Sequence, residues 1–173
     1  MADATAFNLT ADIEAARKLM TTWVNVGTKS SKEWECVGVG VEDSSIETNP
    51  DITTTTDILG VTRTKVNKLE RSQTLDPMTV RGGSDLQVKL YNLMRHDSLP
   101  EMSAFEVMVV YGYVGSTGTY EAELFDACTI TTSSVGGSST VDMPIDISYG
   151  GNHLIGTATT YVSTGTPVWT AAV

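Results

Sequence analysis

Two histidines and two aspartates are the residues of this sequence whose side chains are best suited to chemistry. His96 is expected at the end of a helix and His153 in a turn, with a long apolar hairpin between them, so their spacing does not predict a metal site. Asp142 and Asp146 share one face of an expected strand, about 13 Å apart at roughly 3.3 Å per residue, which exceeds the separation of paired carboxylates in glycoside hydrolases. We therefore interpret the histidines as surface residues and the aspartates as contributors to the surface potential.

The other motifs that could carry chemistry do not predict a catalytic or binding site either. Gly136-Gly137 lacks the helix start and the lysine of a phosphate-binding loop, so a hairpin turn accounts for it better. The sequence contains no serine-nucleophile elbow, no zinc-binding HExxH motif and no calcium loop. Cys36 and Cys128 lie far apart in strand-like contexts and are expected to be buried thiols. We expect neither an enzyme nor a cofactor or metal site.

The charge balance and the distribution of apolar residues exclude further classes of protein. The 173 residues include 11 Lys and Arg against 21 Asp and Glu, a net charge of −10, which argues against a protein that reads DNA through a basic surface. Residues 1–9 lack a signal-peptide pattern, and no apolar run approaches the roughly 18 residues that span a bilayer. We expect a protein that does not insert into membranes by itself and that works where it is made.

Three segments are expected, with the fold in the middle one. Residues 1–31 read as an N-terminal arm with a short helix after Thr10, residues 32–162 as a β domain, and residues 163–173 as a C-terminal arm anchored by Trp169. The first strand of the domain holds Gly38 and Gly40 on one face, which indicates close packing against that face. Residues 42–59 predict a long hairpin loop that turns at Asn49-Pro50-Asp51.

The stretch 60–75 predicts an unusual strand, because simple alternation leaves it polar on both faces. It carries four of the eleven cations, which are Arg63, Lys65, Lys68 and Arg71. Such a strand suits a wall with water on one side and a neighbouring subunit on the other. It equally suits a solvated edge ribbon whose lysines prevent aggregation. The pattern alone leaves both readings open.

The second half of the chain has clearer signals. A helix is predicted over 84–95, with Ser84 as its cap and an apolar stripe of Leu86, Leu90, Leu93 and Met94. The apolar strand that begins at Phe105 turns at Ser116-Thr117-Gly118 and returns through residues 121–132, which makes this hairpin the expected heart of the fold. Strands over 141–149 and 154–162 follow. Together the elements predict a mainly β fold, a two-sheet sandwich or barrel with one flanking α-helix.

Several phrases of the sequence carry a resemblance to a known family through their order and spacing. They are Cys36-Val37-Gly38-Val39-Gly40, Asp57-Ile58-Leu59-Gly60-Val61-Thr62, Glu70-Arg71-Ser72-Gln73-Thr74-Leu75-Asp76-Pro77, Phe105-Glu106-Val107-Met108-Val109-Val110-Tyr111, Ala127-Cys128-Thr129-Ile130, Gly136-Gly137 and Met143-Pro144-Ile145-Asp146-Ile147. From about residue 10 to residue 160 the sequence resembles the tail tube (major tail) proteins of bacteriophages.

The resemblance implies an architecture and a set of partners. Six copies would form a ring whose inner strands merge into one large β-barrel, and rings would stack into a hollow, acidic-lined conduit that delivers DNA into the host. The partners would be other copies, terminators, baseplate or tip, tape measure and possibly sheath, with transient passage of genomic DNA. The protein would belong to the virion, in the phage tail, after assembly in the host bacterial cytoplasm.

The resemblance also implies roles for particular residues. Ile46, Ile52, Ile58 and Leu59 would carry the 42–59 loop onto the next ring or subunit, with a flexible surface hairpin that contacts no neighbour as the alternative. The helix stripe would cover the outer side of the barrel. The four cations of 63–71 would pair with acids such as Glu42, Asp43 and Glu47 of a neighbour, pair within their own chain, or face the channel.

The competing interpretation is a soluble β-sandwich binding module that recognises carbohydrate or protein. In that case Trp34, Trp169 and the tyrosines would form the recognition platform. The sequence does not place these aromatic residues on one face.

Overall fold

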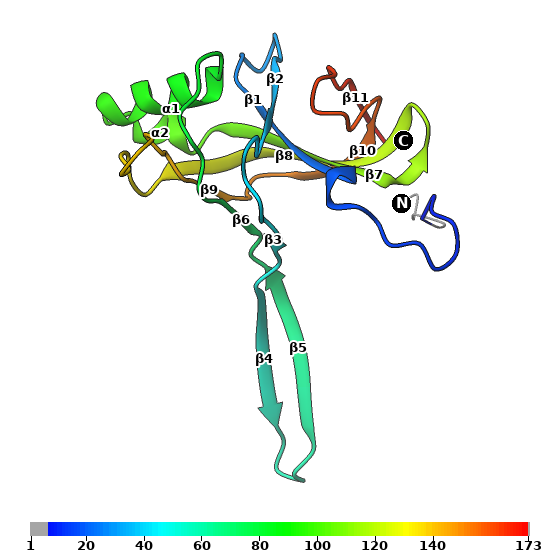
Figure 1. Ribbon diagram of the computed structural model, residues 1–173. Coiled ribbons are helices and arrows are strands. Elements are labelled where there is room, and N and C mark those ends of the chain that lie inside the picture. Colours follow the sequence, from blue (N-terminus) through cyan, green and yellow to red (C-terminus); the bar gives the residue numbers. More distant parts are fainter. Residues whose placement is uncertain (1–6, 173) are drawn as a thin grey trace.

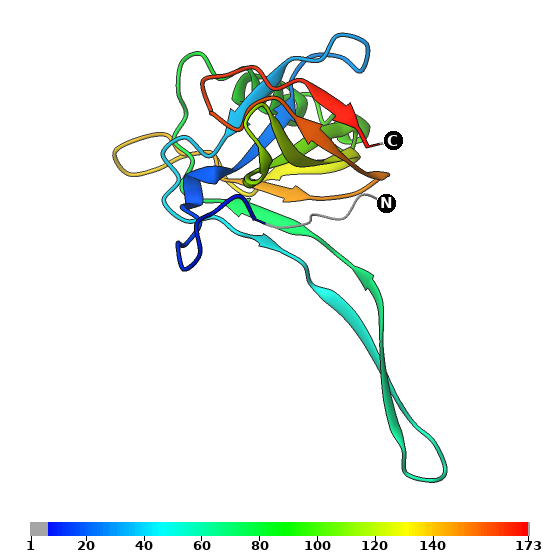
Figure 2. The ribbon, with the colours of Figure 1, turned by 90° about the vertical axis from the view of Figure 1, so that its right-hand side faces the viewer.

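A strongly curled β-sheet with helices against one side forms the body of the protein, and a two-stranded hairpin projects from it (Figures 1 and 2). The computed structural model describes residues 7–172. Its strands are β1 Met20–Asn25, β2 Trp34–Val37, β3 Ile46–Glu47, β4 Pro50–Thr56, β5 Thr62–Leu69, β6 Ser72–Leu75, β7 Phe105–Ser116, β8 Thr119–Thr132, β9 Ile145–Ser148, β10 His153–Ala158 and β11 Trp169–Ala171. Its helices are the 3-10 turn η1 Arg17–Leu19 and the α-helices α1 Asp85–Arg95 and α2 Leu99–Met102.

The β7–β8 hairpin lies at the centre of the sheet, as the sequence predicts. Ser116 pairs with Thr119 across a turn in which Gly118 has φ +80°, a conformation that glycine adopts without steric cost. The strand order is β2-β1-β7-β8-β9-β6-β3, and all of these neighbours are antiparallel. The first half of β8 also pairs with β10, which in turn pairs with β11. The long strand β8 therefore pairs with β7, β9 and β10 within one nine-stranded sheet, and the prediction of a mainly β fold with a flanking helix is confirmed.

Both faces of the central strands are buried, each in its own hydrophobic cluster. On one face, Val24, Val107 and Ile130 pack with Leu86 and Leu90 of α1. On the other face, a cluster around Trp23, Met108 and Leu124 is covered by residues that follow β10, among them Tyr161 and Trp169. Helix α1 begins at the expected cap, because the Ser84 side chain accepts a hydrogen bond from the backbone N–H of Gln87. Leu93 and Met94 pack at the margin of the first cluster.

The N-terminal segment is not an arm as far as residue 31, and this expectation is wrong. No helix follows Thr10, since residues 11–16 are irregular and the chain makes only the single turn η1 before β1. Strand β1 lies between β2 and β7, with Trp23 and Val24 buried on opposite faces. The sequence shows no alternation there because both faces of β1 are covered, so neither face needs polar side chains.

The glycines at 38 and 40 do not sit in a strand. Strand β2 ends at Val37, and Gly38 and Gly40 have φ values of +98° and +84°, which places them in a turn. Glycine is favoured at both positions because it adopts a positive φ without steric cost, and not because a strand face is closely packed there. The C-terminal segment also differs from the expected arm, because β11 pairs with β10 and belongs to the sheet.

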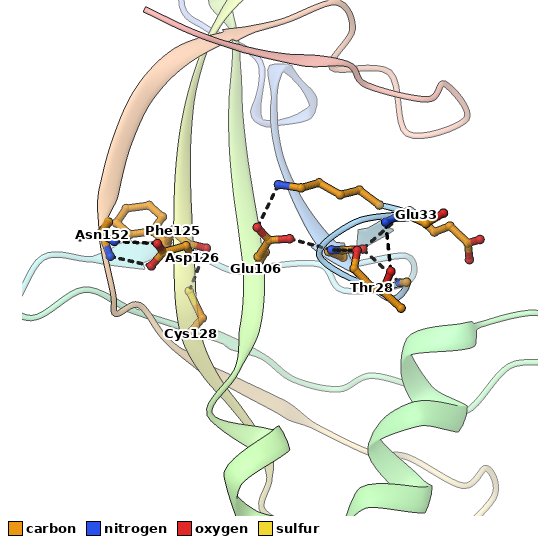
Figure 3. Close-up of polar contacts among 11 residues, drawn as sticks. Thr28, Glu33, Glu106, Phe125, Asp126, Cys128 and Asn152 are labelled. Atoms are coloured by element: carbon orange, nitrogen blue, oxygen red, sulfur yellow. Dashed lines mark hydrogen bonds and ion pairs between the residues drawn. The ribbon is translucent and has the colours of Figure 1, made fainter.

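A polar network holds the β1–β2 loop to the sheet (Figure 3). The buried carboxylate of Glu106 on β7 accepts a hydrogen bond from the Asn25 amide at 2.7 Å and pairs with the Lys32 ammonium at 2.9 Å. Asn25 also accepts hydrogen bonds from the backbone N–H groups of Gly27 and Glu33. One buried carboxylate thus fixes the loop to the central strand.

Candidate subunit interface

The most unusual surface of the molecule is the hairpin β4–β5, which projects away from the body (Figures 1 and 2). Every residue of both strands is exposed. The turn lies at residues 57–61, where the Asp57 carboxylate accepts hydrogen bonds from the backbone N–H groups of Leu59 and Val61 at 2.9 and 3.0 Å. The expected turn at Asn49-Pro50-Asp51 is therefore wrong. The hairpin is longer and lies further along the chain than the predicted loop 42–59.

A β-bulge at Asn67 determines which side chains of the hairpin lie on the same face. The register runs Thr55–Arg63, Thr53–Lys65 and Ile52–Val66, and then shifts so that Asp51 pairs with Lys68 and Pro50 with Leu69. Directly paired residues share a face of an antiparallel ladder, and neighbours along a strand alternate between faces. Two hydrogen bonds agree with this assignment, between Thr56 and Thr62 at 3.0 Å and from Asn67 to Thr53 at 2.6 Å.

One face of the hairpin is apolar. It combines Pro50, Ile52, Val66 and Leu69 with the threonine pairs 54–64 and 56–62 nearer the tip. Ile52 and Val66 are each 55% exposed, and Leu69 is 48% exposed. Simple alternation hides this face, because without the bulge Leu69 would fall on the same side as Arg63 and Lys65. We call this set the apolar face of the hairpin.

The opposite face is polar and basic, with Arg63, Lys65 and Lys68 alongside Asp51, Thr53 and Thr55. Lys68 forms an ion pair with Glu70, and Arg63 lies 3.7 Å from Asp57. Within residues 7–172, Lys65 has no ion pair. Surface pairs of this kind contribute at most about 1 kcal/mol each.

The fourth cation and the first isoleucine of the predicted set lie at the base of the hairpin. Arg71 is half-buried, with its guanidinium 5.6 Å from the centre of the Phe125 ring. Ile46 is half-buried in β3, opposite Gln73 of β6. Neither residue shares the exposure of the hairpin strands. The structure therefore separates the eight predicted contact residues into a projecting group and a basal pair.

The tip carries the two most exposed large apolar side chains among the described residues. Ile58 is fully exposed and Leu59 is 83% exposed. They are consecutive residues of the turn that Asp57 stabilises. Exposed apolar side chains that cluster on a projecting element mark an interaction site more often than isolated ones do.

A network of aromatic and polar groups anchors the hairpin base to the sheet. The Gln73 side-chain oxygen accepts hydrogen bonds from Thr22 at 3.1 Å and from Tyr149 at 2.7 Å. Nearby, the His153 ring stacks on Phe125 at 4.7 Å and lies 3.4 Å from the carboxylate of Glu123. The hydrogen bonds of Gln73 tie β6, which continues from the hairpin, to β1 and to the residue that follows β9.

Burial raises the pKa of two phenols beside this network. The pKa of Tyr149 is raised mainly because its hydroxyl is removed from solvent. The pKa of Tyr111 is raised by burial and by the Glu123 carboxylate, to which its hydroxyl donates a hydrogen bond at 3.1 Å. Both phenols therefore stay neutral donors at physiological pH.

A groove of about 680 Å³ opens beside the hairpin base, between β1, the loop after β2, and the segment after β10. Its lining exposes more apolar than polar surface and includes Val37, Val39, Val41, Leu75 and Val162, but the charged residues Arg17, Lys18 and Glu42 also line it. We call it the seam groove. Its residues come from separate segments of the sequence, so no local pattern could have identified it.

A smaller acidic pocket of about 190 Å³ adjoins the seam groove. It is lined by Asp43, Glu47 and Asp76 together with serines and Thr74, and it shares Ser44 with the groove. No lysine or arginine lines this pocket. The neighbouring Asp146 accepts a hydrogen bond from Thr74 at 2.7 Å.

The residues first considered for chemistry do not converge. In the part of the chain that the structure describes, no three His, Cys, Asp or Glu side chains are placed to hold a metal ion. His96 ends α1 and His153 starts β10, whereas Asp142 accepts hydrogen bonds from Thr79 and Thr140. Both cysteines are free. None of the helices described over residues 7–172 is long and apolar enough to cross a bilayer.

Four aromatic residues of the binding-module interpretation are partly buried against the sheet, whereas Tyr91 on α1 is 49% exposed. Trp34, Trp169, Tyr120 and Tyr161 pack against the cluster around Trp23. The rings of Tyr120 and Tyr161 meet edge to face at 4.9 Å. These side chains stabilise the second face of the sheet and do not form an open platform.

Comparison with known proteins identifies the fold. No family model and no curated protein matches the sequence. Among solved structures, the sheath/tube terminator of PVC, an extracellular contractile injection system, matches 84% of this chain and 99% of its own, with a TM-score of 0.52 and 9% identity. A chain of the extended PVC sheath-tube complex matches 85% of this chain and 94% of its own, with a TM-score of 0.50 and 9% identity.

A third solved structure, the tube-terminating cap of the anti-feeding prophage, matches 89% of this chain and 98% of its own. Its TM-score is 0.50 and its identity is 14%. In all three cases nearly the whole length of the other chain takes part, so the likeness extends over a complete domain and not over a fragment. The chain therefore shares its fold with a sheath/tube terminator, a chain of a sheath-tube complex and a tube-terminating cap.

Proposed function

We propose that this chain is a structural subunit of a phage-type tail tube. In this proposal six copies form a ring, rings stack into a hollow tube, and the tube conducts DNA into the host. The shared fold with injection-system tube components supports the proposal. The partners would be other copies and further tail proteins such as terminators, baseplate or tip, tape measure and sheath.

The observation that carries the proposal is the projecting hairpin. A two-stranded hairpin is marginally stable in water by itself, and this one exposes Ile52, Val66 and Leu69 on one face. Burying an aliphatic side chain of this size contributes roughly 1.5–3 kcal/mol. The residues of the hairpin that would contact a neighbour are Ile52, Ile58, Leu59, Arg63, Lys65 and Lys68, and the basal pair Ile46 and Arg71 would hold the hairpin at its base.

The charge of the chain fits a conduit for DNA. With a net charge of −10, a ring of six copies is strongly acidic, so a phosphate backbone meets few of the cation contacts that make DNA binding persistent. Over the described residues 7–172, Asp146 and the acids Asp43, Glu47 and Asp76 of the pocket form no ion pair with a lysine or arginine.

A second candidate role is that of a ring that ends a tube. Two of the similar structures are a sheath/tube terminator and a tube-terminating cap. The two roles differ in one measurable respect. A tube subunit stacks on copies of itself, whereas a terminator stops at a single ring and needs a different protein beneath it.

Assembly of the purified protein tests the proposal. Sedimentation velocity and negative-stain electron microscopy would follow the protein from micromolar to millimolar concentration. Tubes with a central channel are the expected result, and single rings that never stack would select the terminator role. A protein that remains monomeric throughout would overturn both.

A matched variant tests the part played by the hairpin. Residues 50–69 are replaced by Asn-Gly, which closes a two-residue turn between Asn49 and Glu70. The body should keep its circular dichroism and cooperative unfolding, because no residue of β4 or β5 is buried in it. Assembly should be lost.

A further inference from the structure

The geometry points to the seam groove as the receptor for the hairpin tip of a second copy of this chain. Ile58 and Leu59 would enter the groove between Val39, Leu75 and Val162. This inference rests on the proposed function and adds to it the surface that receives the hairpin.

The groove has the character of a receptor for apolar side chains. Val39 and Val162 on its walls are 54% and 51% exposed, although both belong to a lining that exposes more apolar than polar surface. The floor is formed by the buried residues Val37 and Leu75. An apolar concavity with exposed walls gains stability when apolar side chains displace its water.

A chain cannot fill its own groove. The groove lies at the base of the hairpin, where Ser44 and Gln73 line it. Leu59 is fourteen residues from Gln73 along nearly continuous strand, roughly 45 Å at 3.3 Å per residue. The hairpin extends straight away from the body (Figure 1). The tip therefore reaches a groove only on another molecule.

Charge complementarity favours a second copy over an unrelated partner. The acidic pocket with Asp43, Glu47 and Asp76 adjoins the groove, and the hairpin carries Arg63 and Lys65 behind its tip. Arg63 and Lys65 are the second and fourth residues of β5, directly behind the turn that holds Leu59. Gln73 and Leu75 line the groove, whereas Ser72, Thr74 and Asp76 line the pocket, so the two hollows lie on opposite sides of β6 and meet at Ser44. The hairpin thus supplies basic side chains, and the groove has acidic side chains along the edge that Ser44 shares with the pocket.

The contact joins two different surfaces, so it is heterologous. Each copy offers one tip and one groove, and the contact repeats from molecule to molecule without closing on a pair. The separation of groove and tip within one chain would set the step between successive copies at roughly 40–45 Å, if the hairpin lies along the direction of stacking.

Disulfide cross-linking tests the contact directly. In a Cys36→Ala background, which removes the thiol already in the groove, the variant Leu59→Cys with Val39→Cys places one thiol on the tip and one on the groove wall. The control is Leu59→Cys with Val88→Cys, because Val88 is 59% exposed on the outer side of α1 and lies outside the groove. Both proteins are oxidised at the same concentration, separated on a non-reducing gel and checked by circular dichroism and electron microscopy.

A ladder of dimers, trimers and longer species, at least tenfold stronger than in the control, is the expected result. Assemblies seen by microscopy without a ladder above the control would overturn the tip-and-groove contact and leave the proposed function standing. Equal ladders in both proteins would also overturn it, since they would report random collision. Absence of both assemblies and ladder would overturn the contact together with the proposed function.

A second variant does not alter the hairpin. Val39→Arg places a large charged side chain on the groove wall, and Val88→Arg is its control. Stacking should be lost in the first and kept in the second, with unfolding transitions of both near that of the unmodified protein. Stacking that survives Val39→Arg would overturn the inference.

Discussion

Single residues determine the stability of the body and the reactivity of its two thiols. The two thiols are an example, because burial raises the pKa of both Cys36 and Cys128 to about 11. Cys128 is fully buried, and Cys36 is partly buried beside the seam groove. A thiol reacts as its thiolate, so a pKa near 11 leaves very little reactive species at neutral pH.

We expect alkylation of the folded protein at pH 8 to be at least roughly a hundredfold slower than that of a free cysteine. The rate should rise about tenfold per pH unit toward pH 11 and should reach the free value in denaturant. Mass spectrometry of iodoacetamide-treated samples measures this. Rapid labelling of both thiols at pH 8 in the folded state would contradict their placement.

Glu106 is a buried carboxylate whose loss should lower the stability of the body. Its buried carboxylate joins Asn25 and Lys32. Glu106→Ala leaves the Asn25 amide without that partner, and Lys32 is partly exposed, which limits the loss. We expect unfolding to become easier by about 1–3 kcal/mol. Urea unfolding measures it, with Glu101→Ala on the exposed side of α2 as a control expected to change stability by less than about 0.5 kcal/mol.

Elements with strong local signals could be predicted from the sequence, and others could not. The β7–β8 hairpin and α1 were predictable because each has an apolar pattern of the right period and a cap or turn residue at its end. Strand β1 was not, because its burial on both faces removes the alternation. The turn at 49–51 was misplaced because Asn49 has turn chemistry for another purpose. Its side chain donates to Glu70 O and Ser72 Oγ and fixes the base of the hairpin.

The hairpin shows why the candidate interface was only partly predictable. The proposed contact residues Ile52, Ile58 and Leu59 could be named from their apolar character within a polar stretch. Leu69, which joins Ile52 on the apolar face, could not, because the bulge at Asn67 changes which side chains of β5 share a face. A bulge leaves no consistent mark in the alternation of a sequence.

The two faces of the hairpin give a paired prediction. Ile52→Asp puts a carboxylate on the apolar face, and Thr53→Asp puts the same group one residue away on the basic face, opposite Lys65. Ile52→Asp should raise the critical concentration for assembly at least roughly tenfold, equivalent to about 1.4 kcal/mol of lost contact. Thr53→Asp should change it little. Light scattering against concentration measures both, and equal effects would show that the face does not matter.

At the scale of the whole molecule, charge opposes assembly and apolar contact favours it. Copies with a net charge of −10 repel one another over a Debye length, roughly 30 Å at 0.01 M salt and 8 Å at 0.15 M. The individual ion pairs that the hairpin can form are worth less than about 1 kcal/mol each. Repulsion between whole copies should therefore dominate the response to salt.

We expect assembly to be stronger at 0.15 M salt than at 0.01 M, with a lower critical concentration. Sedimentation in the two buffers at constant pH measures it. If salt in this range dissolved the assemblies, specific ion pairs and not apolar burial would hold the copies together.

The direction in which the hairpin leaves the body has a consequence for the ends of any stack. If tips enter grooves in the proposed ring of six copies, one end of the assembly exposes six unbound hairpin tips and the other exposes six unfilled grooves. The two ends then need different capping proteins, one that offers grooves to the free tips and one that offers tips to the free grooves. A growing tube would be polar, because each single copy already carries its tip and its groove at opposite ends.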